Sequence, residues 1–140
     1  MRIKRLTETA KMPKRANPDD SGLDLYADLN HPVMVGVGGR ARIPTGLAMA
    51  VPSGWEMQVR PRSGLTTNHG VVVMLGTVDS TYRGEVVVTL INFGREAYSV
   101  QPGDKVAQLV IARVELWTPM EVAQLDDTTR GANGFGSTGR

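Results

Sequence analysis

The chain is 140 residues long, which is typical of a single domain with a real hydrophobic core. Its net charge of +2 and its 5% aromatic content disfavour a dedicated nucleic-acid binder, because no basic stripe interleaved with aromatic side chains is present. No apolar run approaches the ~20 residues of a membrane helix, and the absence of cysteine excludes disulfides and thiolate metal sites.

The start of the chain is rich in charge and lacks the apolar stretch of a secretory signal. A chain without cysteine is also compatible with a reducing compartment. We therefore expect a cytoplasmic protein, or one in the equivalent reducing compartment of a host.

Short apolar segments alternate with turns that contain glycine and proline. The segments expected to be strands are residues 23–27, 32–37, 41–44, 47–51, 55–59, 71–74, 86–91, 106–114 and 120–125. Many short strands at this spacing are typical of a sandwich or a barrel, so the predicted fold class is all-β. Only residues 63–68 are expected to form a helix, which would be short.

Two strands differ in their pattern. Residues 55–60 alternate with period two, which predicts one buried and one wet face. Residues 86–91 do not alternate, so we expect both of their faces to be covered, by a second sheet or by another subunit. Residues 130–140 are rich in glycine without periodicity and are expected to be a flexible arm after a domain at 1–129.

Asp24 lies between two leucines near the start of a predicted strand. Alternation places its side chain on one face of the strand and the two leucine side chains on the other face. It is either a solvated carboxylate at an edge or an acid that holds a hydrated cation. Mg²⁺ suits the second role because it keeps several waters and uses few protein carboxylates.

An anion site is one interpretation of the segment that follows the strand at 55–60. Pro61 fixes the backbone there, so Arg62, Ser63 and Gly64 can converge on a phosphate. A surface turn that contains two arginines is the alternative. Gln108, a polar residue inside an apolar run, either satisfies neighbouring backbone groups or points into a site.

The segment between the predicted strands at 71–74 and 86–91 contains Asp79 and Tyr82, a carboxylate and an aromatic residue three positions apart. Loops on a rigid sheet often carry binding and catalytic groups. The alternative is an ordinary hairpin in which aspartate and glycine only form the turn.

The glycine-rich arm contains Arg130, Phe135, Ser137 and Thr138, which offer a stacking face and phosphate donors. Glycine-rich loops of this kind cradle phosphates. Ordering the arm costs roughly 1–2 kcal/mol per residue, so only a highly charged ligand such as a nucleoside triphosphate is expected to close it.

These segments, in this order, resemble the five motifs of the homotrimeric dUTP pyrophosphatase (dUTPase) family. The motifs match residues 21–25, 61–65, 76–85, 103–108 and 130–139. The resemblance implies a jelly-roll-like β barrel with three active sites at subunit boundaries, each covered by the arm of another subunit. It implies hydrolysis of dUTP to dUMP and pyrophosphate with Mg²⁺, which limits uracil in DNA and supplies dUMP for dTMP synthesis.

The resemblance also implies roles for single residues. Asp79 would activate the water that attacks the α-phosphorus, Tyr82 would lie beneath the deoxyribose, and Asp24 would anchor Mg²⁺ through water. The implied substrate-binding residues are Arg62, Ser63, Gly64, Gly76, Thr77, Val78, Tyr82, Gln108, Arg130, Phe135, Gly136, Ser137 and Thr138. Many bacterial members have an asparagine six positions before the catalytic aspartate that helps to read the base; here that position is Val73.

Two rival functions share this fold. A dCTP deaminase would carry a glutamate for amine chemistry where this chain has Thr89, and it would typically lack such an arm. A non-catalytic nucleotide-binding regulator would not need Asp79 or Arg130. Hydrolysis of dUTP is therefore the leading hypothesis.

Overall fold

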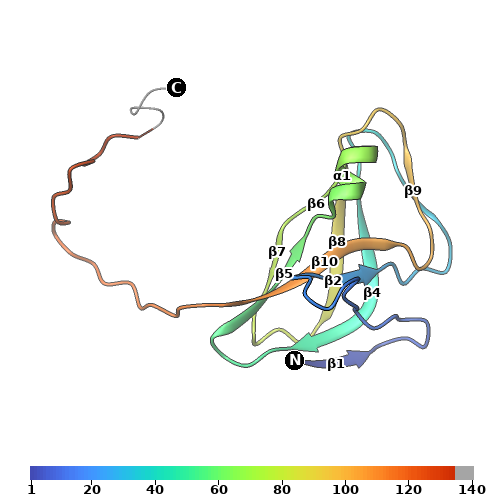
Figure 1. Cartoon of the computed structure of the whole chain (residues 1–140), viewed down its shortest axis with the longest axis horizontal. Coiled ribbons are helices and arrows are strands. Elements are labelled where there is room, and N and C mark those ends of the chain that lie inside the picture. The colour runs from blue at the N-terminus through green and yellow to red at the C-terminus, as the bar shows by residue number, and fades with distance from the viewer. Residues whose placement is uncertain (135–140) are drawn as a thin grey trace.

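The structure is a computed structural model that describes residues 1–134. The described residues form ten β-strands and one helix (Figure 1). The strands are β1 (Arg2–Arg5), β2 (Leu23–Tyr26), β3 (Val33–Val35), β4 (Arg40–Ala50), β5 (Trp55–Arg60), β6 (Val71–Val73), β7 (Gly76–Val78), β8 (Glu85–Asn92), β9 (Tyr98–Val100) and β10 (Lys105–Arg113), and the helix α1 is Ser63–His69.

Two four-stranded antiparallel sheets form the body of the molecule. The first has the order β1-β4-β8-β6 and the second has the order β2-β10-β5-β7, while β3 and β9 make a separate pair. One hydrophobic core contains buried side chains from both sheets, such as Ile43 and Leu90 from the first and Met57 and Leu109 from the second. The predicted all-β, jelly-roll-like fold is confirmed. Within the described chain, however, the sheets do not close into a barrel, because each keeps two strands that pair on one side only.

The side chains of β5 and β8 point alternately to the two faces of their sheets, as in any pleated strand. Met57 and Val59 of β5 are buried while Gln58 between them is half-buried, as predicted. In β8, alternate residues from Val86 to Leu90 are buried in the core. The other face of β8 is only half-buried. Of the two faces that were predicted to be covered, one is therefore buried within this chain.

Several sequence predictions differ from the structure. The strands expected at 41–44 and 47–51 are one strand, β4, whose pairing with β8 shifts register between Pro44 and Ala48. A bulge of this kind adds residues to one strand without ending it. The strand expected at 120–125 is wrong: this segment is not a strand, and Met120 and Leu125 are exposed. An apolar pattern alone does not form a strand where no partner strand lies beside it. Conversely, β1, β7 and β9 were not predicted.

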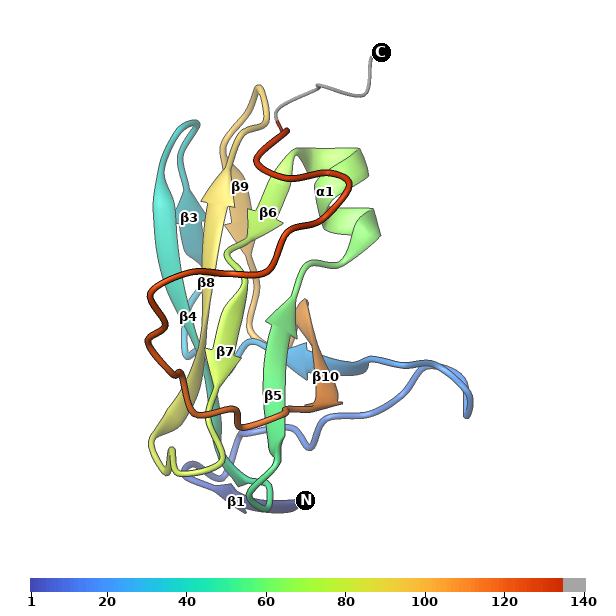
Figure 2. The ribbon, with the colours of Figure 1, turned by 90° about the vertical axis from the view of Figure 1, so that its left-hand side faces the viewer.

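The helix follows β5 directly, close to the predicted 63–68 (Figure 2). It ends at Gly70, whose left-handed conformation (φ 67°) favours glycine. After β10 the chain leaves the sheets as an irregular extended segment (Figure 1). No helix among residues 1–134 is long and apolar enough to cross a membrane.

Candidate active site

A pocket of about 280 Å³ lies beside β7. Its lining residues are Arg42, Val59, Gly76, Thr77, Val78, Asp79, Tyr82, Glu85, Val86, Val87 and Thr89. The pocket therefore brings together five of the predicted site residues, from Gly76 to Tyr82, with residues of β4 and β8. Among residues 1–134, β7 pairs only with β5, beside which it lies in Figure 2, so the other edge of its backbone has no partner strand there.

Hydrogen bonds within the turn hold Asp79 and Tyr82. The Tyr82 N–H donates to the Asp79 carbonyl at 3.0 Å. The Arg83 guanidinium donates to the carbonyls of Ser80 and Tyr82, both at 2.7 Å. The Tyr82 hydroxyl donates to the Glu85 carbonyl at 3.1 Å. The Asp79 side chain itself is exposed, where it can meet water and a ligand.

The bulge of β4 anchors the far end of this turn. The Glu85 carboxylate accepts the Gly46 N–H at 2.7 Å, and the Thr45 hydroxyl donates to the Val86 carbonyl at 2.6 Å. Gly46 has φ 65°, and a Cβ there would overlap the Asp28 carboxylate. The bulge therefore requires glycine and connects the turn to the core of the first sheet.

The other predicted residues gather where β2, β10 and the end of β5 meet. Asp24 makes ion pairs with the Arg62 Nε at 3.1 Å and the Lys105 Nζ at 2.7 Å. Arg62 also donates to the Lys105 carbonyl at 3.0 Å. Asp24 is half-buried, so the alternative of a free, solvated edge carboxylate is wrong. One carboxylate thus positions two cations.

Gln108 connects three of the sequence motifs. Its Nε2 donates to the Pro61 carbonyl at 2.7 Å, and a Cβ at Gly22 would overlap its Oε1. The amide therefore satisfies a neighbouring backbone group, as one of the two interpretations predicted. Asp24 and Arg60 lie opposite Gln108 on the two flanking strands, which explains why these motifs meet.

A second pocket, of about 360 Å³, opens next to this ion-pair cluster. Arg62, Gly64, Tyr98 and Lys105 are among its lining residues. Burial, followed by the nearby Asp104 carboxylate, raises the pKa of Tyr98, while Arg62 acts in the opposite direction. The Tyr98 phenol therefore stays protonated at neutral pH and can act as a donor.

The two pockets are well separated within one chain. Asp79 follows Val78, which pairs with Met57, whereas Arg62 lies five residues beyond Met57. Asp79 continues one residue past Val78 toward the start of β5, so at ~3.3 Å per residue the backbones of Asp79 and Arg62 are about 20 Å apart along the direction of β5. Within one chain, the structure does not bring Asp79 together with Asp24, Arg62 and Gln108.

Known proteins resemble this chain along its whole length. The dUTPase family model matches residues 8–139. The chain belongs to the dUTPase family.

Two curated dUTPase-family relatives are similar over nearly their full length. The deoxyuridine 5'-triphosphate nucleotidohydrolase of Syntrophotalea carbinolica is 47% identical, with 99% of this chain and 96% of that protein covered. The protein of the same name from Caulobacter vibrioides is 48% identical, with 99% and 94% covered.

Solved dUTPase structures share the fold. A mutant dUTPase of Staphylococcus bacteriophage 80alpha with dUpNHpp has a TM-score of 0.92 at 23% identity, covering 99% of this chain and 98% of that chain. A mutant dUTPase of phage phi11 of S. aureus, described with a structural Mg(II) ion, has a TM-score of 0.76 at 26% identity. For this second structure, 90% of this chain and 96% of that chain are covered.

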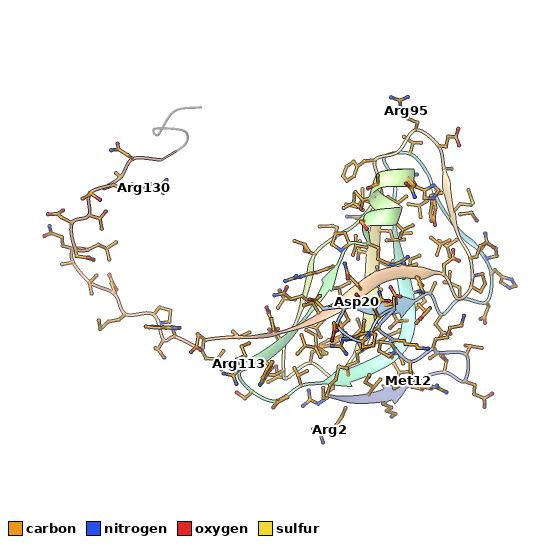
Figure 3. All side chains as sticks on the ribbon, in the orientation of Figure 1. Arg2, Met12, Asp20, Arg95, Arg113 and Arg130 are labelled. Atoms are coloured by element: carbon orange, nitrogen blue, oxygen red, sulfur yellow. The ribbon has the colours of Figure 1, made fainter. Side chains whose placement is uncertain are left out.

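Half of the fifth dUTPase motif, residues 135–139, lies outside the described residues. Arg130 is exposed on the extended segment, far from the sheets (Figure 3). The predictions for Phe135, Gly136, Ser137 and Thr138 concern residues outside the described part of the chain. The roles given to this arm, and its boundary at residue 130, stay predictions.

Sequence reasoning missed Arg42, Glu85 and Lys105. Lys105 is three residues before Gln108, so strict alternation would place the two side chains on opposite faces of β10. The register shift between Lys105 and Ala107 brings Lys105 to the face of Asp24. No local signal predicts that bulge. Arg42 and Glu85 could have been found only from the pairing of β4 with β8.

Proposed function

We propose that this dUTPase-family protein hydrolyses dUTP to dUMP and pyrophosphate, and so limits uracil in DNA and supplies dUMP for dTMP synthesis. The observation that carries this proposal is the pocket in which Asp79, Tyr82 and the open edge of β7 face one space. A carboxylate can accept a proton from a water, and an aromatic ring can pack against a sugar. The hydrogen-bonding groups of a backbone edge can bind a base.

The pocket beside β7 receives the nucleoside. Its volume of about 280 Å³ lies near the low end of the ~300–1,000 Å³ of ligand pockets, which favours a nucleoside over a whole triphosphate. The backbone of Gly76–Val78 reads the uracil edge, because β7 pairs on one side only. Val73 is buried in the core, so its side chain does not contribute to base reading. The Tyr82 ring lies beneath the deoxyribose and leaves no room for a 2′-hydroxyl.

Asp79 acts as the general base. Its carboxylate accepts a proton from the attacking water. The water oxygen bonds to the α-phosphorus, the bond from that phosphorus to the bridging oxygen breaks, and pyrophosphate leaves with the electron pair. General-base catalysis of this kind typically raises the reaction rate by roughly 10²–10⁴-fold.

The triphosphate binds at the cluster around Arg62. Arg62, Ser63, Gly64 and Gln108 hold the phosphates, and Asp24 keeps the Arg62 guanidinium in place. Charge stabilisation and in-line positioning supply the larger part of phosphoryl-transfer catalysis.

Residues of the arm complete the site. Phe135 stacks on the uracil. Arg130, Gly136, Ser137 and Thr138 grip the terminal phosphate.

The residues fit Mg²⁺ as a hydrated ion. Residues 1–134 contain no cluster of three or more His, Cys, Asp or Glu side chains for direct coordination. Mg²⁺ usually keeps several waters and binds through one or two carboxylates plus substrate phosphates. Asp24 fits this role, because a carboxylate has about four lone-pair positions and Arg62 and Lys105 each contact one oxygen. When bound, Mg²⁺ neutralises charge on the phosphate oxygens.

Each active site combines chains of a homotrimer. Reacting atoms must approach to ~3–3.5 Å, whereas the backbones of Asp79 and Arg62 of one chain are about 20 Å apart, so the phosphate at Asp79 is held by Arg62 of another chain. The half-buried outer face of β8 is suited to another subunit. The exposed apolar side chains of Trp117, Met120 and Leu125 favour docking of the extended segment on a second copy.

The experiment measures pyrophosphate release from dUTP, dCTP, dATP, dGTP, dTTP and UTP with Mg²⁺. We expect release from dUTP well above all the others. Ammonia release from dCTP would instead identify a deaminase. Binding of dUTP without release of pyrophosphate would identify a regulator.

A further inference from the structure

The Tyr82 ring folds back over Gly84. A Cβ added to Gly84 would overlap the Tyr82 hydroxyl, and it would lie 2.6 Å from Cζ and 3.1 Å from Cε2 of the ring. Gly84 is not among the glycines of the described residues with positive φ, so its backbone is open to any residue type. A larger residue at position 84 is therefore opposed by the position of the ring and not by the backbone conformation of the turn.

The ring is also held at its polar end. The Tyr82 hydroxyl donates to the Glu85 carbonyl at 3.1 Å. Glu85 begins β8, and its own carboxylate accepts the Gly46 N–H of β4 at 2.7 Å. The hydroxyl is thus connected through one residue to the two central strands of the first sheet.

These two contacts leave one face of the ring toward the pocket. Tyr82 is 45% exposed and lines the pocket with Asp79 and the β7 backbone. Because Gly84 lacks a side chain, the ring rests against the backbone itself. A larger residue at position 84 would displace the Tyr82 ring from this position.

We propose that Gly84 determines sugar specificity by fixing the position of the Tyr82 ring. Gly84 is a positioning residue: it contacts the ring and not the substrate. The proposal rests on the proposed function, in which Tyr82 excludes a ribose 2′-hydroxyl. A ring that is displaced from Gly84 no longer sets the depth of the sugar pocket, so a ribonucleotide is excluded less well.

The first test compares Gly84→Ala with the wild type on dUTP and UTP. We expect the ratio of kcat/KM for dUTP to kcat/KM for UTP to fall by about tenfold or more, the scale of one misplaced group in a pocket. Gly36→Ala is the matched control, because nothing lies within 4 Å of a Cβ at Gly36 and its φ is not positive. An unchanged ratio in Gly84→Ala would overturn the proposal.

A double-mutant cycle distinguishes positioning from a general defect. Tyr82→Phe removes the oxygen that the new Cβ overlaps most closely. Gly84→Ala should therefore reduce selectivity less in the Tyr82→Phe background than in the wild type, because contacting residues are non-additive. If Gly84→Ala unfolds while the double variant folds, the overlap is supported. Equal effects in both backgrounds, or unfolding of both variants, would refute it.

A measurement on the free protein separates this proposal from the proposed function. The chain has three tyrosines, so selective ¹³C-labelling of tyrosine gives few signals, and Tyr82→Phe assigns one of them. We expect Gly84→Ala to shift the Tyr82 signal and to leave those of Tyr26 and Tyr98 in place. An unmoved Tyr82 signal would overturn the proposal even in an active dUTPase. Lack of dUTP hydrolysis with a shifted signal would overturn only the assigned activity.

Discussion

Asp79 takes its position from backbone groups around it. The carbonyl of Asp79 accepts the Tyr82 N–H, and Arg83 donates to two carbonyls of the same turn. These bonds close the turn without using the Asp79 carboxylate. A residue at this position is therefore held in place and remains available to accept a proton from water.

Asp79→Asn should abolish hydrolysis and preserve binding. An amide has nearly the size of a carboxylate, so the turn persists, but it cannot act as the base. We expect kcat to fall by roughly 10²–10⁴-fold with little change in the Kd of a non-hydrolysable dUTP analogue, measured by calorimetry. Asp19→Asn, at an exposed position away from both pockets, is the control. Near-normal turnover of Asp79→Asn would remove the proposed base.

At the scale of elements, the bulge of β4 connects three parts of the chain. The Leu6 N–H donates to the Gly46 carbonyl, and the Gly46 N–H donates to Glu85. The Asp28 N–H donates to the Pro44 carbonyl next to the bulge. The turn between Asp79 and Glu85 is thus supported by the same residues of the β4 bulge that hold the N-terminal segment.

Gly46→Ala tests the bulge. A residue other than glycine at φ 65° is strained, and a Cβ would lie 2.7 Å from both Ala10 Cβ and Thr7 Oγ1. Strain of this kind costs of order 1–3 kcal/mol, and crowding adds to it. We expect a lower free energy of unfolding in urea. Gly54→Ala is the control for strain without crowding, because Gly54 has φ 79° and nothing lies within 4 Å of a Cβ at that position. Equal losses of unfolding free energy in the two variants would argue against crowding at the bulge.

The described part of the arm belongs to neither sheet. Among residues 1–134 the last strand ends at Arg113, so residues 130–134 pair with no strand. We expect the truncated protein to keep its circular-dichroism spectrum and melting temperature and to lose most of its dUTP hydrolysis. The full-length chain is the reference. A truncated protein with full activity would contradict the role of the arm.

At the scale of the whole molecule, the two pockets of one chain do not form one site. The register of β5 with β7 places Asp79 and Arg62 at opposite ends of β5. Under the proposed function, a nucleotide that contacts both groups bridges two chains. In a closed cyclic trimer, every chain then supplies Asp79 to one site and Arg62 to another.

Complementation tests this arrangement. Asp79→Asn and Arg62→Ala should each be inactive alone, because each removes one half of every site. After co-expression, random mixing in a cyclic trimer restores about a quarter of the sites, which activity assays can measure. Light scattering should give three times the 15.1 kDa of one chain. No recovery in mixed trimers, or an active monomer, would refute the shared site.

The sequence predicted the chemical groups of the site better than their arrangement. Asp79, Arg62 and Gln108 were candidates from residue type and spacing, and the family resemblance gave them their roles. The strands before Arg62 and around Gln108 were predicted close to their observed bounds, whereas β7, which leads to Asp79, was not predicted. The strand expected at 120–125 is wrong because its apolar pattern has no partner strand among residues 1–134. Gly84 was not among the predicted site residues, and its contact with the Tyr82 ring is seen only in the structure.

The sequence by itself determined the all-β class, the buried face of β5 and the residue types that can perform chemistry, because period-two alternation and turn chemistry are local properties of a chain. Only the tertiary structure decided which of these residues meet. Asp24 and Gln108 come together because β2 pairs with β10, and Lys105 joins them through a bulge. Pairing between strands distant in sequence depends on register and bulges across a sheet, and no local pattern specifies those.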